Sequence, residues 1–479
     1  MAGDVKGFLE ACRRVGEALS KHAAGGEFIP IFTHDDPDGI TAGAILGKAL
    51  IRLNGRFLIR IIDRIEENLL SELQSSTSYK VYVFSEIGSG YLDLLKPLAS
   101  KAEVIVMDHH KPSGKADHPN LTHLNPHDYG IDGASEISGS AVCYFVAKAI
   151  NPKNVDLAPL AIIGALGDLQ DKNSERRLTG LNQMVVEDAK QARLLETSRD
   201  LLFYGRETRP VHKALASTMN PFIPGLSGQE DKCYGFLVNL GVRLMNGERW
   251  RLPSELSWEE KEKIFSEITA YLASLGFPSS TILQLIGEVY TLVEEDRWTP
   301  LRDAREYASL LNACSKMGKP SLALAICLGE RGETLEEAQK ILNEYRRTLS
   351  EVMGSLIREK HRIKTLKNIY LIECYGIVDE HKLSPVASLL SSSGTIDSKK
   401  PLMALTDAGE GEVKASARAS QNLVELGVNL GEILRAAAEA VGGRGGGHSV
   451  AAGATIPKAL VEKFIDMVDR LVGESIGEG

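Results

Sequence analysis

Two short segments of the sequence carry carboxylate and imidazole side chains that could bind divalent metal ions. Residues 108–110, Asp-His-His, directly follow the apolar run 104–107, which we expect to be a buried strand. Residues 34–39, His-Asp-Asp-Pro-Asp-Gly, follow a second apolar run at 28–32. Open α/β sheets bind ligands at the carboxyl ends of their strands, and carboxylates crowded there repel one another unless cations neutralise them. The two segments together predict a metal site.

The segment after the first strand offers three donor side chains. Alternate residues of an extended chain share a face, so His34, Asp36 and Asp38 can point together. Gly39 then allows the backbone to turn away behind them. Carboxylate oxygens with one or two imidazoles suit Mn²⁺ or Mg²⁺. Alternatively, the segment is a solvated Asp-Pro-Asp-Gly turn.

Three further features extend this set. Asp108, His109 and His110 could form a surface turn, but their place at a second strand end favours a shared site. Asp168 ends the apolar helix expected at 157–167, where an acid opposes the helix dipole unless a cation compensates it; a solvated helix end is the alternative. The glycine-rich run 442–448 permits close backbone approach to a phosphate or sugar, or is a mobile loop.

Composition is ordinary for a globular protein. The chain has 479 residues, of which 43% are hydrophobic and 25% charged, and its length predicts two or three domains. No apolar stretch approaches the roughly 20 residues that span a bilayer, and no secretory signal is recognisable. The six scattered cysteines predict reduced thiols in a cytoplasmic protein with no membrane partner. A net charge of −9 does not exclude nucleic acid, because bound cations would offset an acidic cluster.

The order of expected elements predicts two α/β lobes. Strands expected at 28–32, 57–62, 80–84 and 103–107 alternate with helices expected at 5–20, 39–52, 90–100 and 138–168, which indicates a mainly parallel sheet. Strand signals then vanish over 195–295, which is broken by prolines and rich in aromatic residues, and we expect a mostly helical insertion there. We divide the chain into a catalytic lobe (1–194 and 296–334), this insertion (195–295), a linker helix (335–366) and a second lobe (367–479).

In these motifs the sequence resembles the DHH superfamily of phosphoesterases. His34 to Gly39 is similar to the first family motif, Asp108-His109-His110 to the motif that names the family, and Asp168 to the fourth. Gly442 to His448 resembles the GGGH signature of the associated C-terminal domain. The matches occur in the family's order over almost the whole chain.

One position departs from the family pattern. The second motif of the family ends a strand with an aspartate that bridges both metals, and Glu86 stands at the corresponding position here. The additional methylene shifts the carboxylate by about one bond, and a misplacement near 1 Å can cost about 10²-fold in rate. Glu86 therefore either keeps the bridging role or weakens the site.

The resemblance implies a two-metal phosphodiesterase. Two Mn²⁺ or Mg²⁺ ions would be held by the following residues: His34, Asp36, Asp38, Glu86, Asp108 and Asp168. The resemblance places Asp38, Asp108, His109 and His110 in catalysis, with one histidine stabilising the transition state or protonating the leaving oxygen. The substrate's terminal phosphates would be gripped by Ser416, Arg418, Arg444, Gly445, Gly446, Gly447 and His448 of the second lobe.

The additional segment of about 100 residues makes the chain similar to archaeal RecJ-like proteins, including the GINS-associated nuclease. These are related to the eukaryotic replisome factor that accompanies GINS and MCM. This similarity implies a single-strand-specific exonuclease that acts 5′ to 3′, on DNA in preference to RNA. It also implies docking of GINS through 195–295 and a possible contact with the MCM helicase. Two alternatives are a replisome scaffold with a weak metal site and a 3′-to-5′ exonuclease of RNA or short oligonucleotides.

Overall fold

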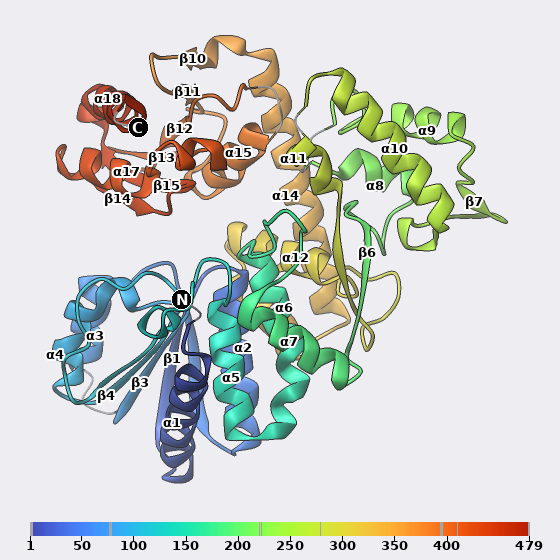
Figure 1. Ribbon diagram of the computed structural model, residues 1–479. Helices are drawn as coiled ribbons and strands as arrows, with labels where there is room; N and C mark the ends of the chain where they lie inside the picture. Colours follow the sequence, from blue (N-terminus) through green and yellow to red (C-terminus); the bar gives the residue numbers. More distant parts are fainter. Residues whose placement is uncertain are drawn as a thin grey trace. The chain divides into compact units, whose positions relative to one another are not determined.

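The structure is a computed structural model that describes residues 3–477 except 76–78, 220, 222, 278, 393–395 and 410. The chain forms two compact units (Figure 1). The first contains residues 1–214 and 237–342, and the second contains 215–236 and 343–479. Within the described ranges, no helix has both the length and the apolar character needed to cross a bilayer.

A five-stranded parallel sheet forms the centre of the first unit, with the strand order β2-β1-β3-β4-β5. Its strands are β1 (Phe28–His34), β2 (Arg56–Ile62), β3 (Val81–Ser85), β4 (Glu103–Met107) and β5 (Leu121–Leu124). The predicted α/β class is therefore confirmed. The fifth strand was not expected, because its four residues, Leu-Thr-His-Leu, give too short a signal. Parallel strands bring their carboxyl ends to one edge, so residues that follow β1, β3 and β4 are neighbours.

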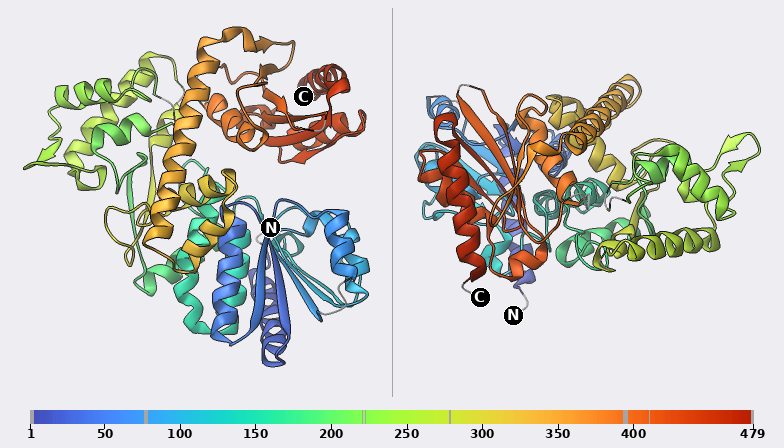
Figure 2. Two further views of the ribbon diagram at one scale, coloured as in Figure 1. Left: turned by 180° about the vertical axis from the view of Figure 1, so that it is seen from behind. Right: turned by 90° about the horizontal axis from the view of Figure 1, so that it is seen from above.

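Helices cover both faces of this sheet, as the view from behind in Figure 2 shows. On one face lie α1 (Val5–Ala24), α2 (Pro37–Arg52) and α5 (Gly139–Ile150), and on the other α3 (Glu67–Ser75) and α4 (Leu92–Ala99). The unit also contains α6 (Ala158–Gly167), α7 (Gly180–Gln191), α12 (Ala304–Lys316) and α13 (Pro320–Leu328). The helical segment expected at 138–168 contains two helices, since α5 ends before Pro152 and α6, the apolar helix expected at 157–167, starts after a 3₁₀ turn.

The insertion begins and ends in a two-stranded antiparallel ribbon, β6 (Leu195–Leu201) with β9 (Ile286–Leu292). The expectation that strands are missing from 195–295 is therefore wrong. β6 reads Leu-Glu-Thr-Ser-Arg-Asp-Leu, and its mostly polar residues give no strand signal, although Leu195, Asp200 and Leu201 are buried. Between the strands lie α8 (Val211–Ser217), α9 (Glu230–Asn239), α10 (Trp258–Ser274), α11 (Ser279–Ile282) and the hairpin of β7 (Met245–Asn246) with β8 (Arg249–Trp250).

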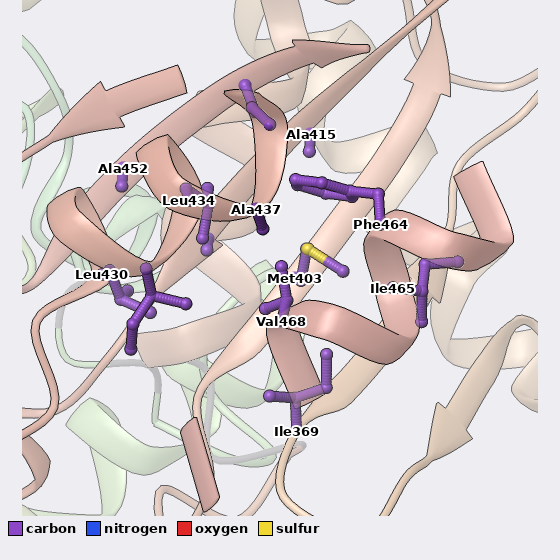
Figure 3. Close-up of a cluster of buried hydrophobic side chains, with 14 of the residues drawn as sticks. Ile369, Met403, Ala415, Leu430, Leu434, Ala437, Ala452, Phe464, Ile465 and Val468 are labelled. Carbon is purple, nitrogen blue, oxygen red and sulfur yellow. The ribbon is translucent and has the colours of Figure 1, made fainter. Parts of the chain in front are cut away.

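The second unit has a six-stranded mixed sheet in the order β10-β11-β12-β13-β15-β14. The expected linker helix is α14 (Glu333–Arg358), which begins in the first unit and ends in the second. The strands are β10 (Ile363–Thr365), β11 (Tyr370–Glu373), β12 (Leu402–Asp407), β13 (Glu412–Arg418), β14 (Arg444–Gly447) and β15 (Ala451–Pro457). The remaining helices are α15 (Glu380–Ser392), α16 (Gln421–Glu425), α17 (Leu430–Glu439) and α18 (Val461–Gly477). Leu434 of α17 and Phe464 of α18 pack with Met403 in the hydrophobic core of this second unit (Figure 3).

The glycine-rich run is an edge strand of this sheet. Residues 444–447 form β14, which pairs with β15, so the alternative of a mobile loop is wrong for these residues. The strand lies close against α17, and a Cβ on Gly445 would stand 2.6 Å from the carbonyl oxygen of Leu434. A Cβ on Gly446 would meet nothing within 4 Å. Glycine at position 445 therefore permits the close contact with α17. At position 446 the space beside the backbone is open.

Candidate metal centre

The sheet topology brings the predicted donor side chains to one edge. His34 is the last residue of β1, Glu86 follows β3, and Asp108 follows β4, and these three strands are consecutive in the sheet. Asp36 and Asp38 start helix α2, and Asp168 ends helix α6. All of the expected donors of the first lobe thus lie at or near this edge.

Three overlapping groups of side chains place possible ligand atoms within 4.8 Å of one another. One group consists of His34, Asp36 and Glu86; a second of Glu86, His109 and His110; and a third of Asp38, His109 and Asp168. Glu86 and His109 each belong to two groups. The overlap makes these two residues the links between neighbouring candidate ion positions.

Glu86 is central to this arrangement. Its Oε2 lies 3.0 Å from His34 Nδ1, while its Oε1 lies 3.5 Å from His109 Nε2 and 3.6 Å from His110 Nδ1. The residue is 2% exposed, and its φ of 59° lies in the left-handed region. A buried carboxylate with imidazoles on both sides is placed as a bridging ligand would be.

Backbone amides and helix ends fix the aspartates. Asp38 accepts hydrogen bonds from the backbone N–H groups of Gly139 (2.7 Å) and Ser140 (3.0 Å) at the start of α5. Asp36 caps α2 through the N–H of Gly39 at 2.8 Å, and its other oxygen lies 2.9 Å from His34 Nδ1. The aspartates are thus oriented by groups that the fold holds in place.

His109 points an unmatched nitrogen at the carboxylates. Its Nδ1 lies 2.7 Å from the carbonyl oxygen of Gly133, which can only accept, so Nδ1 carries a hydrogen. The buried Nε2 has no hydrogen-bond partner among the described residues. It lies 3.5 Å from Glu86, 3.7 Å from Asp38 and 3.8 Å from Asp168. Ligands that share one octahedral cation at about 2.1 Å lie roughly 3 Å apart, so these separations are slightly wider than those around a bound ion.

Asp108 is placed differently from the other predicted ligands. Its Oδ2 accepts the N–H of Ser89 at 2.8 Å, and its Oδ1 accepts the N–H of His109 at 2.7 Å and lies 2.8 Å from His110 Nδ1. It does not occur in the three groups found among the described residues. Burial raises the pKa of Asp108, but His110 and these amides outweigh it and hold the pKa well below its usual range. Asp108 thus orients the His110 ring and holds the backbone of His109.

The pKa values of the crowded carboxylates indicate whether a cation would be favourable at this site. Burial, together with Glu86 and Asp168, raises the pKa of Asp38 to about 7, although His109 opposes this. Burial and the nearby Asp36 and Glu86 also raise the pKa of Asp168. Divalent cations would remove this repulsion and would satisfy His109 Nε2, and mixed oxygen and imidazole donors suit Mn²⁺. The residues present therefore fit a divalent metal.

Supporting residues were not predicted from the sequence. Gln170 donates to Asp168, and Asn125 donates to the His110 carbonyl and to Ser89. Ser89 Oγ lies 2.9 Å from His123 Nε2, and His123 Nδ1 lies 2.9 Å from Asp128 Oδ2. This is the order of side chains in the Ser-His-Asp triad of a hydrolase. Ser89 is fully buried and its Oγ already accepts from Asn125, so it is an anchor for the Asp108 loop and cannot act as a nucleophile.

The predicted substrate-binding residues lie together in the second unit. Ser416 and Arg418 are on β13, and Arg444 to Gly447 form β14, with β15 between them. His448 follows β14 and donates its backbone N–H to Ala451. Ser416 is opposite Gly453, which is opposite Gly446. These pairings form a row of small residues across three strands.

Arg418 has an unusual environment. Its guanidinium donates to the hydroxyls of Ser384 (2.6 Å), Ser388 (2.9 Å) and Ser416 (3.1 Å). The hydrogen-bond partners of Arg418 in the described part of the chain are all neutral groups, and burial lowers the pKa of Arg418 to about 10. A partly buried cation held by neutral groups is suited to an anionic ligand.

Comparison with known proteins supports this interpretation of the fold. Residues 203–286 match the family described as the DHH-CID domain, and residues 370–474 match the DHHA1 domain. An uncharacterized protein of Methanocaldococcus jannaschii is 31% identical over 480 residues, covering 99% of this chain and 100% of that protein. The RecJ of Bacillus subtilis, named as a single-stranded-DNA-specific exonuclease, is 29% identical over 36% of this chain and 23% of its own length.

The chain belongs to the DHH superfamily and is RecJ-like. Two solved structures share its fold. CDC45 from Entamoeba histolytica has a TM-score of 0.67 at 12% identity, with 97% of this chain and 99% of that chain covered. Mn²⁺-bound RecJ from Thermus thermophilus has a TM-score of 0.57 at 17% identity, and this chain spans 55% of its length. These two likenesses show a shared fold.

Proposed function

We propose that this DHH-superfamily chain is a divalent-metal-dependent exonuclease specific for single strands, acting 5′ to 3′ on DNA. The observation that carries the proposal is the meeting of three donor groups around Glu86 and His109 at one edge of the sheet. The Bacillus and Thermus relatives named as single-stranded-DNA-specific exonucleases support the substrate class. The direction of cleavage and the preference for DNA rest on the resemblance alone.

In this proposal the donor groups hold two Mn²⁺ or Mg²⁺ ions, which when bound supply Lewis-acid stabilisation of charge on the phosphate. His34 and Asp36 would serve one ion, Asp38 and Asp168 the other, with Glu86 between them. His110 has a partly exposed side chain (37%), so a substrate can reach it. It would stabilise the transition state or protonate the leaving oxygen.

The second unit would hold the strand. Arg418 offers a cation without a carboxylate partner among the described residues, and the row from Ser416 to Gly446 offers a surface without bulky side chains. Together with Arg444 and His448, these groups would bind phosphates of a single strand. Terminal phosphate binding would make cleavage proceed from an end.

A direct test uses single-stranded DNA and RNA labelled at the 5′ or the 3′ end, incubated with Mn²⁺, Mg²⁺ or a chelator. We expect metal-dependent release of the label from the 5′ end of DNA and no cleavage by Asp38→Ala. The same substitution at a surface acid, Asp466→Ala, should leave the rate unchanged. Full activity of Asp38→Ala in Mn²⁺ would contradict the proposed site.

We further propose that the insertion binds GINS, and through the same assembly contacts the MCM helicase. The likeness of the whole fold to CDC45 supports a replisome role. Trp258 (66% exposed) and Leu275 (49%) lie at the two ends of α10 and offer apolar contacts. A pull-down with purified GINS should weaken for Trp258→Ala with Leu275→Ser, while Leu426→Ser, at a position 56% exposed and outside the insertion, should bind normally. Unchanged binding of the double variant would contradict this surface.

Two other functions remain as defined alternatives. A catalytically weak replisome scaffold is favoured by Glu86 at the aspartate position and by the CDC45 fold. It predicts intact GINS binding with no metal-dependent cleavage. A 3′-to-5′ exonuclease of RNA or short oligonucleotides predicts release of the 3′ label in the same assay. Each outcome of the labelling experiment therefore selects one function.

A further inference from the structure

Gln170 occupies a buried position directly behind the metal centre. It follows the candidate ligand Asp168 by two residues and is 4% exposed. The intervening Leu169 has a φ of 59°, in the left-handed region that is unfavourable for leucine. This turn allows Gln170 to fold back beneath Asp168. Local strain of this kind persists only where surrounding contacts enforce it.

The contacts of Gln170 fix the orientation of its amide. Its Nε2 donates to Asp168 Oδ2 at 2.9 Å and to the carbonyl oxygens of Gly133 at 2.9 Å and Ile137 at 3.2 Å. These three groups can only accept when the aspartate is ionised, so the nitrogen must face them. The carbonyl oxygen, Oε1, then faces Asn182, whose Nδ2 donates to it at 2.6 Å.

Gln170 therefore connects all three members of one donor group. The Gly133 carbonyl that it contacts is also the partner of His109 Nδ1. Asn182 accepts from the backbone N–H of Ser138, the residue that caps α5, and the first amides of α5 hold Asp38. A run of amides thus extends from the α5 start through Asn182 and Gln170 to Asp168.

The next residue anchors the same turn on its other side. Asp171 is 2% exposed and pairs with Arg305 of α12 at 2.5 Å and with Arg176 at 3.5 Å. Arg305 also donates to the carbonyl oxygen of Glu288 on β9. Because both Gln170 and Asp171 are held, the backbone that carries Asp168 is fixed from two directions.

We propose that Gln170 is a positioning residue that sets the metal affinity of the group formed by Asp38, His109 and Asp168. It orients the Asp168 carboxylate, so that Asp168 presents an oxygen to the cation shared with Asp38 and His109. Partners of metal ligands of this kind typically change metal affinity by about 10- to 100-fold when they are removed. This role rests on the proposed function only in that the group must bind a divalent ion.

The test measures Mn²⁺ affinity by calorimetry, without any substrate, for four forms of the full chain: unaltered, Gln170→Met, Asp168→Ala, and both together. Methionine keeps the side-chain length and removes the amide. We expect Gln170→Met to weaken Mn²⁺ binding by about 10- to 100-fold in the unaltered background. In the Asp168→Ala background we expect less than about a threefold effect, because coupled residues are non-additive.

A matched control removes another buried amide of the same unit. Asn154 is fully buried, donates to the Ala147 carbonyl and accepts from Arg52. Asn154→Leu should lower the melting temperature and leave Mn²⁺ affinity unchanged. Equal weakening by Gln170→Met in both backgrounds, or none in either, would overturn the positioning role while leaving the proposed function intact. Failure of the unaltered chain to bind Mn²⁺ would overturn the proposed function and this role with it.

Discussion

Glu86 and Gly139 are complementary in shape. A Cβ on Gly139 would stand 2.8 Å from the Cβ of Glu86 and closer still to its Cγ. The Cβ and Cγ atoms of Glu86 thus occupy space that glycine at position 139 leaves free. Gly139 is also the residue whose N–H binds Asp38. One backbone position therefore serves both carboxylates.

Gly139→Ala should consequently disable the site. The new methyl group would displace the Glu86 side chain, and a shift near 1 Å costs about 10²-fold in rate. We expect Mn²⁺-dependent cleavage of labelled single-stranded DNA to fall at least about 100-fold. Gly354→Ala in helix α14, where a Cβ meets only Arg358 at 3.5 Å, should retain activity. Normal activity of Gly139→Ala would show that Glu86 is not confined in this way.

Glu86→Asp distinguishes a bridging glutamate from a weakened site. The left-handed backbone at 86 tolerates aspartate, so the substitution tests side-chain length. If the glutamate is fitted to its neighbours, shortening it withdraws the carboxylate from His34 and from the His109–His110 pair, and Mn²⁺ affinity should fall about tenfold or more. Calorimetry on both forms measures this. A gain in affinity and rate would instead favour the scaffold alternative, in which glutamate has weakened an ancestral site.

Mn²⁺ should stabilise the folded chain. The raised pKa values of Asp38 and Asp168 show that burial and carboxylate repulsion disfavour their ionised forms, and a bound cation would reverse this. At a concentration 100 times the dissociation constant, binding adds about 2.7 kcal/mol to the free energy of unfolding. We expect the melting temperature to rise in Mn²⁺ and to return in chelator. Asp38→Ala with Asp168→Ala should lose most of the rise, and an equal rise in that variant would place the ion elsewhere.

Arg418→Lys should weaken substrate binding more than catalysis. Lysine keeps the charge but cannot contact Ser384, Ser388 and Ser416 at once in the geometry that orients the guanidinium. We expect KM for single-stranded DNA to rise about 10- to 100-fold, in line with the loss of a charged hydrogen bond, with kcat changed less. Arg362→Lys is a matched control, since Arg362 bonds backbone carbonyls of the same unit. Equal KM values for Arg418→Lys and the unaltered chain would remove Arg418 from the substrate site.

The sequence was sufficient to predict four of the five strands of the main sheet and the residues at its edge. Apolar runs that end in carboxylate and imidazole groups, as at His34 and Asp108, combine a local strand signal with a chemical one. The polar β6 and the glycine-rich β14 lacked such signals, because their pairing with β9 and β15 depends on residues distant in sequence. Gln170 could not be recognised for the same reason, since its role comes from contacts with Gly133 and Asn182.

The difference in role between Asp108 and the other acidic residues could be recognised only from the structure. Spacing alone makes every acid of the motifs a possible ligand. Both oxygens of Asp108 are occupied by N–H groups and His110, whereas His109 Nε2 is unmatched and faces three carboxylates. The direction in which each donor atom points, which no sequence pattern encodes, decides this difference.

The most direct test of the central claim is an anomalous difference map from a crystal of the full chain grown with Mn²⁺, collected at the manganese absorption edge. The account predicts peaks on both sides of the Glu86 carboxylate, one toward His34 and Asp36 and one toward Asp38 and Asp168. A map with no peak among these side chains, or with manganese bound only elsewhere, would contradict it.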